Sequence, residues 1–335
     1  MLRQTSSAGD SRPAGSPGLR ARLVRILAWV VTAGILFLLF RRTPVKEVVA
    51  AARGAASWEV PVTLALVAAL YICDTFAIWK TFAWFVAPMP FVDVLLVRGA
   101  TYLFAALNYN VGQGAIVYFV HKKTGAPVMR AVATVLLMMG INVLALLFLA
   151  SIGLLAAPEV PRAVTTIVAV AYVGLLIYVV ALLIRPRALV SRPLFDVVLG
   201  AGIGGHVRAL MVRLPHIGAL FAFQLALLWG FHVAVPVVTA MAALPIVFLA
   251  AALPISVQGL GTTQAAMIYF FARYAPGDHA AQQATVMAAS LVGQALALAF
   301  QALVGIICLR SRVGRTVGQD QGEEAAALAS AKSQS

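Results

Sequence analysis

The sequence predicts an all-α, polytopic helical bundle that lies in a membrane. Of its residues, 62% are hydrophobic and only 11% are charged, whereas a soluble domain is about half apolar and about a quarter charged. The mean hydropathy is +0.96. Apolar segments also recur at roughly the 20-residue length that a helix needs to cross the hydrocarbon core. Together these observations favour lipid, and not water, as the solvent of most of the chain.

Six segments are long and apolar enough to be full spans. They lie near 23–40, 60–79, 131–157, 163–184, 217–238 and 283–309. Residues 1–20 are rich in Ser, Gly, Pro and Arg, and residues 311–335 are also polar, so we expect two solvated tails around one transmembrane domain, 21–310. No small-residue cleavage pattern directly follows the first apolar run, which favours a retained span over a signal peptide, although Ala50-Ala51-Ala52 is an alternative cleavage site.

Two further apolar regions are interrupted, and we expect each to form a re-entrant hairpin of broken helices. The first, 99–120, contains Asn108, Asn110, Gly112, Gln113 and Gly114. The second, 244–274, contains Pro254, Gln258, Gly259 and Gly261. Irregular backbone at membrane depth is tolerated only where protein buries it or where it lines a wet cavity. These polar residues therefore either line a ligand path or simply satisfy the helix breaks.

The basic residues predict an orientation in the inner (plasma) membrane with both termini in the cytoplasm. If each hairpin returns to the side from which it came, roughly three quarters of the 25 Lys and Arg residues are cytoplasmic, as the positive-inside rule requires. The segment 41–58 is an exception, because it places four cations outside. The two hairpins then enter from opposite sides, as in transporters built from inverted repeats. The net charge of +14 follows from orientation and does not indicate nucleic-acid binding.

The second hairpin has the residues of a helix break followed by a new helix start. Pro254 is expected to end the incoming helix, Gly259 and Gly261 to allow a tight turn, and Thr262 or Thr263 to cap the outgoing half-helix. The N–H groups at that helix start would suit an anion such as a phosphate. The alternative is a helix kink with an ordinary cap.

The two interrupted regions resemble the motifs of the lysylphosphatidylglycerol synthase transmembrane-region family, a family of flippase-like membrane proteins. In the first region, Gly112-Gln113 and Lys123-Thr124-Gly125 match the family's Gly-Glu pair and its basic-x-Gly element. The second region is similar to Pro-x-Ser-x-Gly-Gly-x-Gly-x-x-Glu, through Pro254, Ser256, Gly259, Gly261 and Gln264, with Gln258 in the first Gly place. Both family glutamates are glutamine here, and glutamine forms hydrogen bonds but cannot titrate. The family's aminoacyl transfer belongs to a separate soluble domain, so the resemblance implies no enzymatic activity for this chain.

Asp74 is a carboxylate inside the second predicted span. Such a charge costs about 2.5–3.5 kcal/mol at the membrane centre, so Asp74 should be protonated, paired or close to a cavity. Lys80 and Arg98 are its candidate partners. Other single polar residues on apolar helices are expected to hydrogen-bond between helices: Asn142, Gln224, His232, Gln294 and Gln301.

The region 185–216 is predicted to be the longest internal loop, since it holds five arginines and a glycine cluster. Within it, the stretch from Arg208 to Arg213 either lies on anionic headgroups as an amphipathic segment or forms part of a solvated loop.

These features lead us to expect a translocator of an anionic phospholipid or lipid-linked metabolite. The candidate substrate-binding residues are Asp74, Arg98, Asn110, Gly112, Gln113, Pro254, Ser256, Gln258, Gly259, Gly261 and Gln264. The alternative is a non-catalytic scaffold or accessory subunit of a cell-envelope lipid or glycan pathway, and a third interpretation is an intramembrane enzyme that uses Asp74 and His121. We expect membrane lipids and a protein of envelope biosynthesis as partners, and no cofactor or metal.

Overall fold

The computed structural model describes residues 45–107, 109–157, 161–185, 192–252 and 259–311, together with 30, 33–34 and 37–41. Within these ranges the chain is helical and contains no strand. Several predictions fall outside the described residues: most of the span 23–40, the tails 1–20 and 312–335, and Asn108, Pro254, Ser256 and Gln258, together with the side chain of Asn110.

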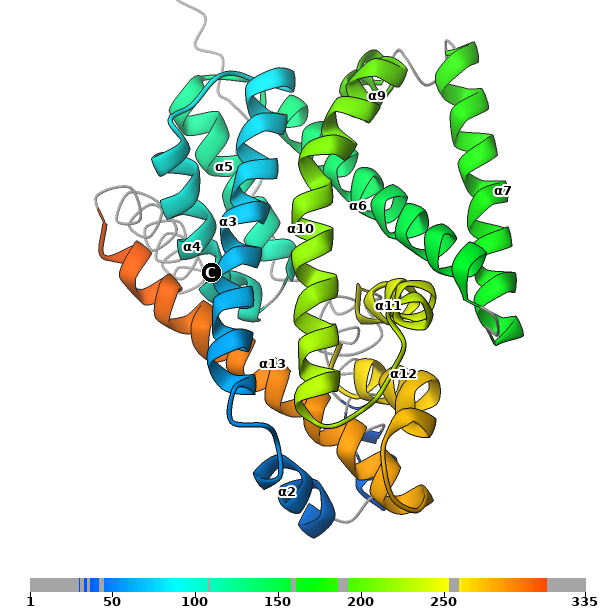
Figure 1. The fold of residues 1–335 in the computed structure, drawn as a ribbon. Coiled ribbons are helices and arrows are strands. Elements are labelled where there is room, and N and C mark those ends of the chain that lie inside the picture. The colour runs from blue at the N-terminus through cyan, green and yellow to red at the C-terminus, as the bar shows by residue number, and fades with distance from the viewer. Residues whose placement is uncertain are drawn as a thin grey trace, which may run out of the picture.

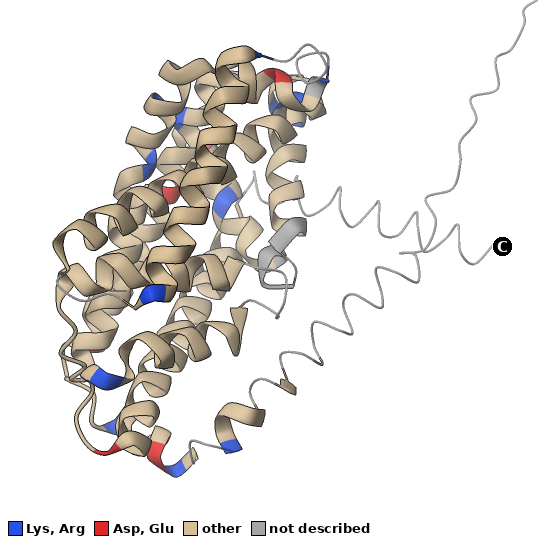
Figure 2. Cartoon of the chain, turned by 90° about the vertical axis from the view of Figure 1, so that its right-hand side faces the viewer, with Lys and Arg blue, Asp and Glu red and all other residues tan. Residues whose placement is uncertain are grey.

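Five helices are long and apolar enough to cross a membrane. They are α3 (Glu59–Phe85), α6 (Val128–Ala156), α7 (Arg162–Ile184), α10 (Gly202–Gly230) and α13 (His279–Leu309) (Figure 1). Large apolar side chains cover their outer faces; on α7, for example, Leu176 and Ile177 are 64% and 66% exposed. Most of the ribbon along the bundle carries neither Lys and Arg nor Asp and Glu (Figure 2). Such a surface requires lipid around it, and the protein is therefore a helical integral membrane protein.

The helix α10 corrects the prediction for residues 185–238. The predicted loop 185–216 is wrong from residue 193 onward, because α9 (Pro193–Gly200) is followed directly by α10, which continues through Pro215. Arg208 and Arg213 thus lie inside a long helix and not on a separate headgroup-bound segment. The charged residues lower the local hydropathy, which is why the span was expected to begin only at 217. A transmembrane helix tolerates proline where neighbouring groups satisfy the freed backbone.

The region of the first predicted hairpin folds as two antiparallel helices, α4 (Phe91–Leu107) and α5 (Tyr109–Thr124). Lys123 Nζ lies 2.8 Å from Asp93 Oδ2, which joins the end of α5 to the start of α4. Trp79 Nε1 donates to the Met89 carbonyl at 2.7 Å, which holds the start of α4 beside the C-terminal part of α3. We call this the open end of the pair, because α4 begins and α5 ends there. The break between α4 and α5 is narrower than predicted, because Gly112, Gln113 and Gly114 are all helical.

The second interrupted region opens at the other end of the bundle. Its described elements are α11 (Val237–Ala252), α12 (Thr262–Phe271) and the 3₁₀ turn η2 (Ala272–Tyr274). Ala234 N donates to the Tyr274 carbonyl at 2.9 Å, which joins the segment before α11 to the end of η2. Ala56 N donates to the Gly230 carbonyl at 2.7 Å, so the segment leading into α11 starts beside the N-terminal end of α3. The two helix pairs thus open toward opposite ends of α3 (Figure 1).

Close helix crossings hold the bundle together at small residues. A Cβ built on Gly153 of α6 would come within 2.2 Å of the backbone nitrogen of Ala242 on α11. A Cβ on Gly293 of α13 would come within 2.2 Å of Leu227 Cδ1 on α10, so this small residue allows the two helices to pack closely. At the end of the bundle, α2 (Val45–Arg53) packs against α13.

Candidate functional site

A buried ion cluster connects four helices around Asp74 of α3. Its Oδ2 accepts a hydrogen bond from Arg98 Nε of α4 at 2.6 Å, and its Oδ1 accepts one from Arg213 Nη1 of α10 at 2.6 Å. Arg213 also donates from Nε and Nη2 to Oδ1 of Asn142 on α6, at 3.1 and 2.9 Å. The side chain of Asp74 is only 5% exposed, and those of Arg98 and Arg213 are 14% and 15% exposed. We call Asp74, Arg98, Arg213 and Asn142 the ion cluster.

The ion cluster lies deep in the bundle. At 1.5 Å per residue, Asp74 is roughly 22 Å from the first residue of α3 and roughly 16 Å from the last. Asn142 occupies the middle of α6, equally far from both of its ends. An ionised group at such depth is costly unless it is paired, and functional sites are the usual places where this cost is accepted.

Aromatic and histidine side chains surround the ion cluster. The Arg98 guanidinium lies 4.9 Å from the ring centroid of Tyr102, a cation–π distance, and Tyr102 in turn packs against Tyr71 at 5.6 Å. His216 Nδ1 is 3.9 Å from Asp74 Oδ1 and 3.4 Å from the Leu70 carbonyl. These neighbours enclose the carboxylate on the side of α3 and α4.

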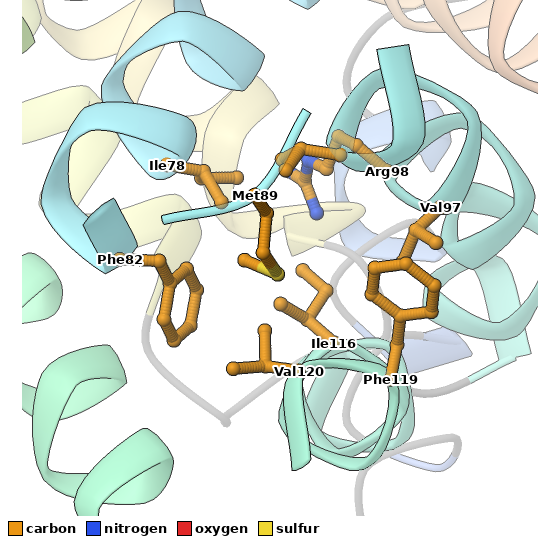
Figure 3. Close-up of a pocket in the computed structure, with 9 residues that line it drawn as sticks. Ile78, Phe82, Met89, Val97, Arg98, Ile116, Phe119 and Val120 are labelled. Atoms are coloured by element: carbon orange, nitrogen blue, oxygen red, sulfur yellow. The ribbon is translucent and has the colours of Figure 1, made fainter. Parts of the chain in front are cut away.

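Two small pockets adjoin the ion cluster, one at each arginine. The first is about 10 Å³, room for about one water molecule. Its lining consists of Arg98 and apolar side chains of α3, α4, α5 and the α3–α4 loop: Ile78, Phe82, Met89, Val94, Val97, Ile116, Phe119 and Val120 (Figure 3). The second is also about 10 Å³ and is lined by Arg213 with Ala77, Thr81, Met138, Ile141 and Ala209. Each pocket thus brings mainly apolar walls beside an arginine side chain.

Gln113 lies on α5, about one turn before Ile116 of the first pocket. It precedes Ile116 by three residues and Val120 by seven, so all three lie on one face of the helix. Its side chain is half-buried. Within the described residues, Gln113 therefore contributes the next polar group along the helix face that lines the pocket.

Gln264, the second glutamine of the two motifs, lies inside the bundle between α12 and α13. Its side chain is completely buried. Its Oε1 accepts the backbone N–H of Gly261 at 2.6 Å, and its Nε2 donates to Ser290 Oγ at 3.1 Å and to Gln294 Oε1 at 3.0 Å. Both N–H donors are used inside the protein, so the amide holds α12 against α13.

The turn before α12 agrees with the sequence in part. Gly259 and Gly261 adopt positive φ angles of 72° and 87°, as the predicted tight turn requires. The predicted cap by Thr262 or Thr263 is wrong, because Gly261 is the N-cap residue and Gln264 reaches back to its N–H. Thr262 instead donates to the Gly259 carbonyl at 3.0 Å.

The partners of Asp74 were predicted only in part. Arg98 is confirmed as a partner, whereas Lys80 lies over the Trp79 ring at 4.2 Å. The hydrogen bond between helices predicted for Asn142 is confirmed, with Arg213 of α10 as its donor. The sequence interpretation missed Arg213 itself as a partner of Asp74, because it placed Arg213 in the region 185–216 outside the spans. The sequence shows that Asp74 needs a cationic partner, but it does not show which of the distant arginines provides the second one. His121 lies at the end of α5, with Nδ1 2.7 Å from the Ala126 carbonyl, and does not belong to the ion cluster.

The fold and the ion cluster define a class, namely a helical integral membrane protein with buried charges in its interior. No protein family model matches the chain, and no curated protein matches it. The family resemblance therefore rests on the residues of the two motifs alone.

Proposed function

We propose that this protein binds an anionic lipid at the ion cluster and moves it between the two leaflets of the membrane. The observation that carries the proposal is the pair of guanidiniums of Arg98 and Arg213, held at mid-depth by Asp74, with each arginine side chain beside a small pocket. A guanidinium binds phosphate oxygens through planar, charge-assisted hydrogen bonds.

The arrangement of the helix pairs supports this proposal. The pair α4–α5 opens at the C-terminal end of α3, and the pair α11–α12 opens at its N-terminal end. If each pair enters the membrane from the side on which it opens, a headgroup from either leaflet would pass one of these two helix pairs on its way to the ion cluster. The α4–α5 pair contributes Arg98 and Gln113 to that route.

A transport assay with purified full-length protein tests the proposal. Proteoliposomes containing fluorescent phosphatidylglycerol are treated with dithionite, which quenches only the label in the outer leaflet. We expect loss of label from the inner leaflet only when the protein is present, and strongly reduced loss in Arg213→Gln, which retains the Asp74–Arg98 pair. The matched control is Arg208→Gln on the same helix, because Arg208 is exposed and lies 5.1 Å from the Trp84 ring.

Three outcomes are informative. Transport in the wild type and Arg208→Gln but not in Arg213→Gln supports the proposal. Equal loss in both variants contradicts a specific role of the ion cluster. No lipid movement by the wild-type protein contradicts translocation and favours an accessory role in the envelope.

A further inference from the structure

The ion cluster has more positive than negative charge. Two guanidiniums share the single carboxylate of Asp74, at 2.6 Å each, and Asn142 is neutral. With a neutral His216, the four residues of the cluster carry a net charge of +1. In a medium of low dielectric constant such an excess is costly, and an anion from outside the protein would remove it.

Arg213 retains hydrogen-bonding capacity for that anion. A guanidinium has five N–H donors. Bonds to Asp74 and Asn142 use three of them, and the described residues provide no acceptor for the other two. The same side chain borders the second pocket, whose other lining residues carry no charge.

We propose that Arg213 binds a lipid headgroup phosphodiester with one negative charge, and that Asp74 sets this preference by cancelling one of the two arginine charges. This inference rests on the proposed function and names its substrate class. A phosphodiester would bring the cluster to neutrality. A phosphomonoester with two charges would leave an excess negative charge, and a zwitterionic headgroup would bring an ammonium toward two guanidiniums.

The residue Asn142 allows a test in which charge changes but geometry does not. In Asn142→Asp, a carboxylate oxygen replaces the amide oxygen that already accepts two bonds from Arg213, so the contacts remain and the cluster becomes neutral. In Asn142→Ala the contacts disappear but the charge of +1 remains. Asp74→Asn raises the charge to +2, although the loss of both ion pairs can also prevent folding.

Equilibrium binding of labelled lipids to the full-length protein in nanodiscs measures the preference without requiring transport. For the wild type we expect phosphatidylglycerol to bind about tenfold more tightly than phosphatidylcholine and than phosphatidic acid at a pH where the latter is dianionic. Tenfold corresponds to about 1.4 kcal/mol. Asn142→Asp should lose the preference for phosphatidylglycerol over phosphatidylcholine, Asn142→Ala should keep it, and folded Asp74→Asn should favour phosphatidic acid.

The outcomes separate this inference from the proposed function. If the wild type binds phosphatidylglycerol selectively and Asn142→Asp loses this selectivity, the net charge of the ion cluster sets the headgroup preference, even if transport assays fail. If lipid is transported without headgroup selectivity, or if Asn142→Asp and Asn142→Ala lose the selectivity equally, the cluster charge does not set the preference, but translocation still stands. Equally tight binding of soluble glycerophosphoglycerol overturns the assignment to a lipid and identifies a soluble phosphodiester as the ligand.

Discussion

Replacing Gln264 by leucine should destabilise the protein, because this side chain forms three hydrogen bonds in a completely buried position. Leucine has a similar volume, so the change removes the hydrogen bonds without opening a large cavity. Buried hydrogen bonds contribute about 1 kcal/mol each in soluble proteins, and about 0.6, up to about 1.7, kcal/mol in a membrane protein. For three bonds we expect a loss of roughly 2–4 kcal/mol.

This loss is measurable by thermal unfolding in detergent, followed by the fluorescence of the five tryptophans. Proteins of 150–250 residues lose about 2–4 °C in Tm per kcal/mol, and for this longer chain we expect a decrease of roughly 4–8 °C. The matched control is Gln283→Leu on α13, whose exposed amide lies 3.4–3.5 Å from the His279 ring and should change Tm by about 1 °C or less. An unchanged Tm for Gln264→Leu, or an equal decrease for both variants, would refute a structural role for Gln264.

Two further predictions concern packing and surface charge. Gly153→Ala places a Cβ 2.2 Å from the backbone of Ala242 and should lower the free energy of unfolding by about 1–3 kcal/mol through overpacking. The control is Gly140→Ala on the same helix, where a Cβ meets nothing within 4 Å and should not lower Tm. Equal effects of the two changes in thermal unfolding would contradict the α6–α11 crossing. Asp93→Asn removes the ion pair with Lys123, whose side chain is 46% exposed, and should cost less than about 1 kcal/mol. A larger decrease in Tm that salt does not alter would show that the pair is not a screened surface contact.

The sequence predicted those helices whose length and hydropathy are set directly by the surrounding lipid. Span length and hydropathy predicted α3, α6, α7 and α13, because each of these helices must satisfy the membrane by itself. The need of Asp74 for a partner also led to Arg98, which follows it within one helix pair.

The same reasoning failed where partners meet only in the folded bundle. Nothing local indicates that Arg213 of α10 faces Asp74 of α3, since this depends on how the two antiparallel helices are aligned. Likewise, the partners of Gln264 are Ser290 and Gln294 on α13, and a family-like motif could not reveal that its amide is used within the protein.

The sequence separation of the partners of Asp74 has a consequence for biosynthesis. Arg98 follows Asp74 by 24 residues, whereas Arg213 follows it by 139. At about 5–20 residues per second, the ribosome makes Arg213 roughly 7–28 s after Asp74. Asp74 and Arg98 can therefore enter the bilayer as a neutral pair, while α10 arrives later with an uncompensated cation. The second guanidinium therefore joins Asp74 only when α10 packs against α3, long after the Asp74–Arg98 pair has been synthesised.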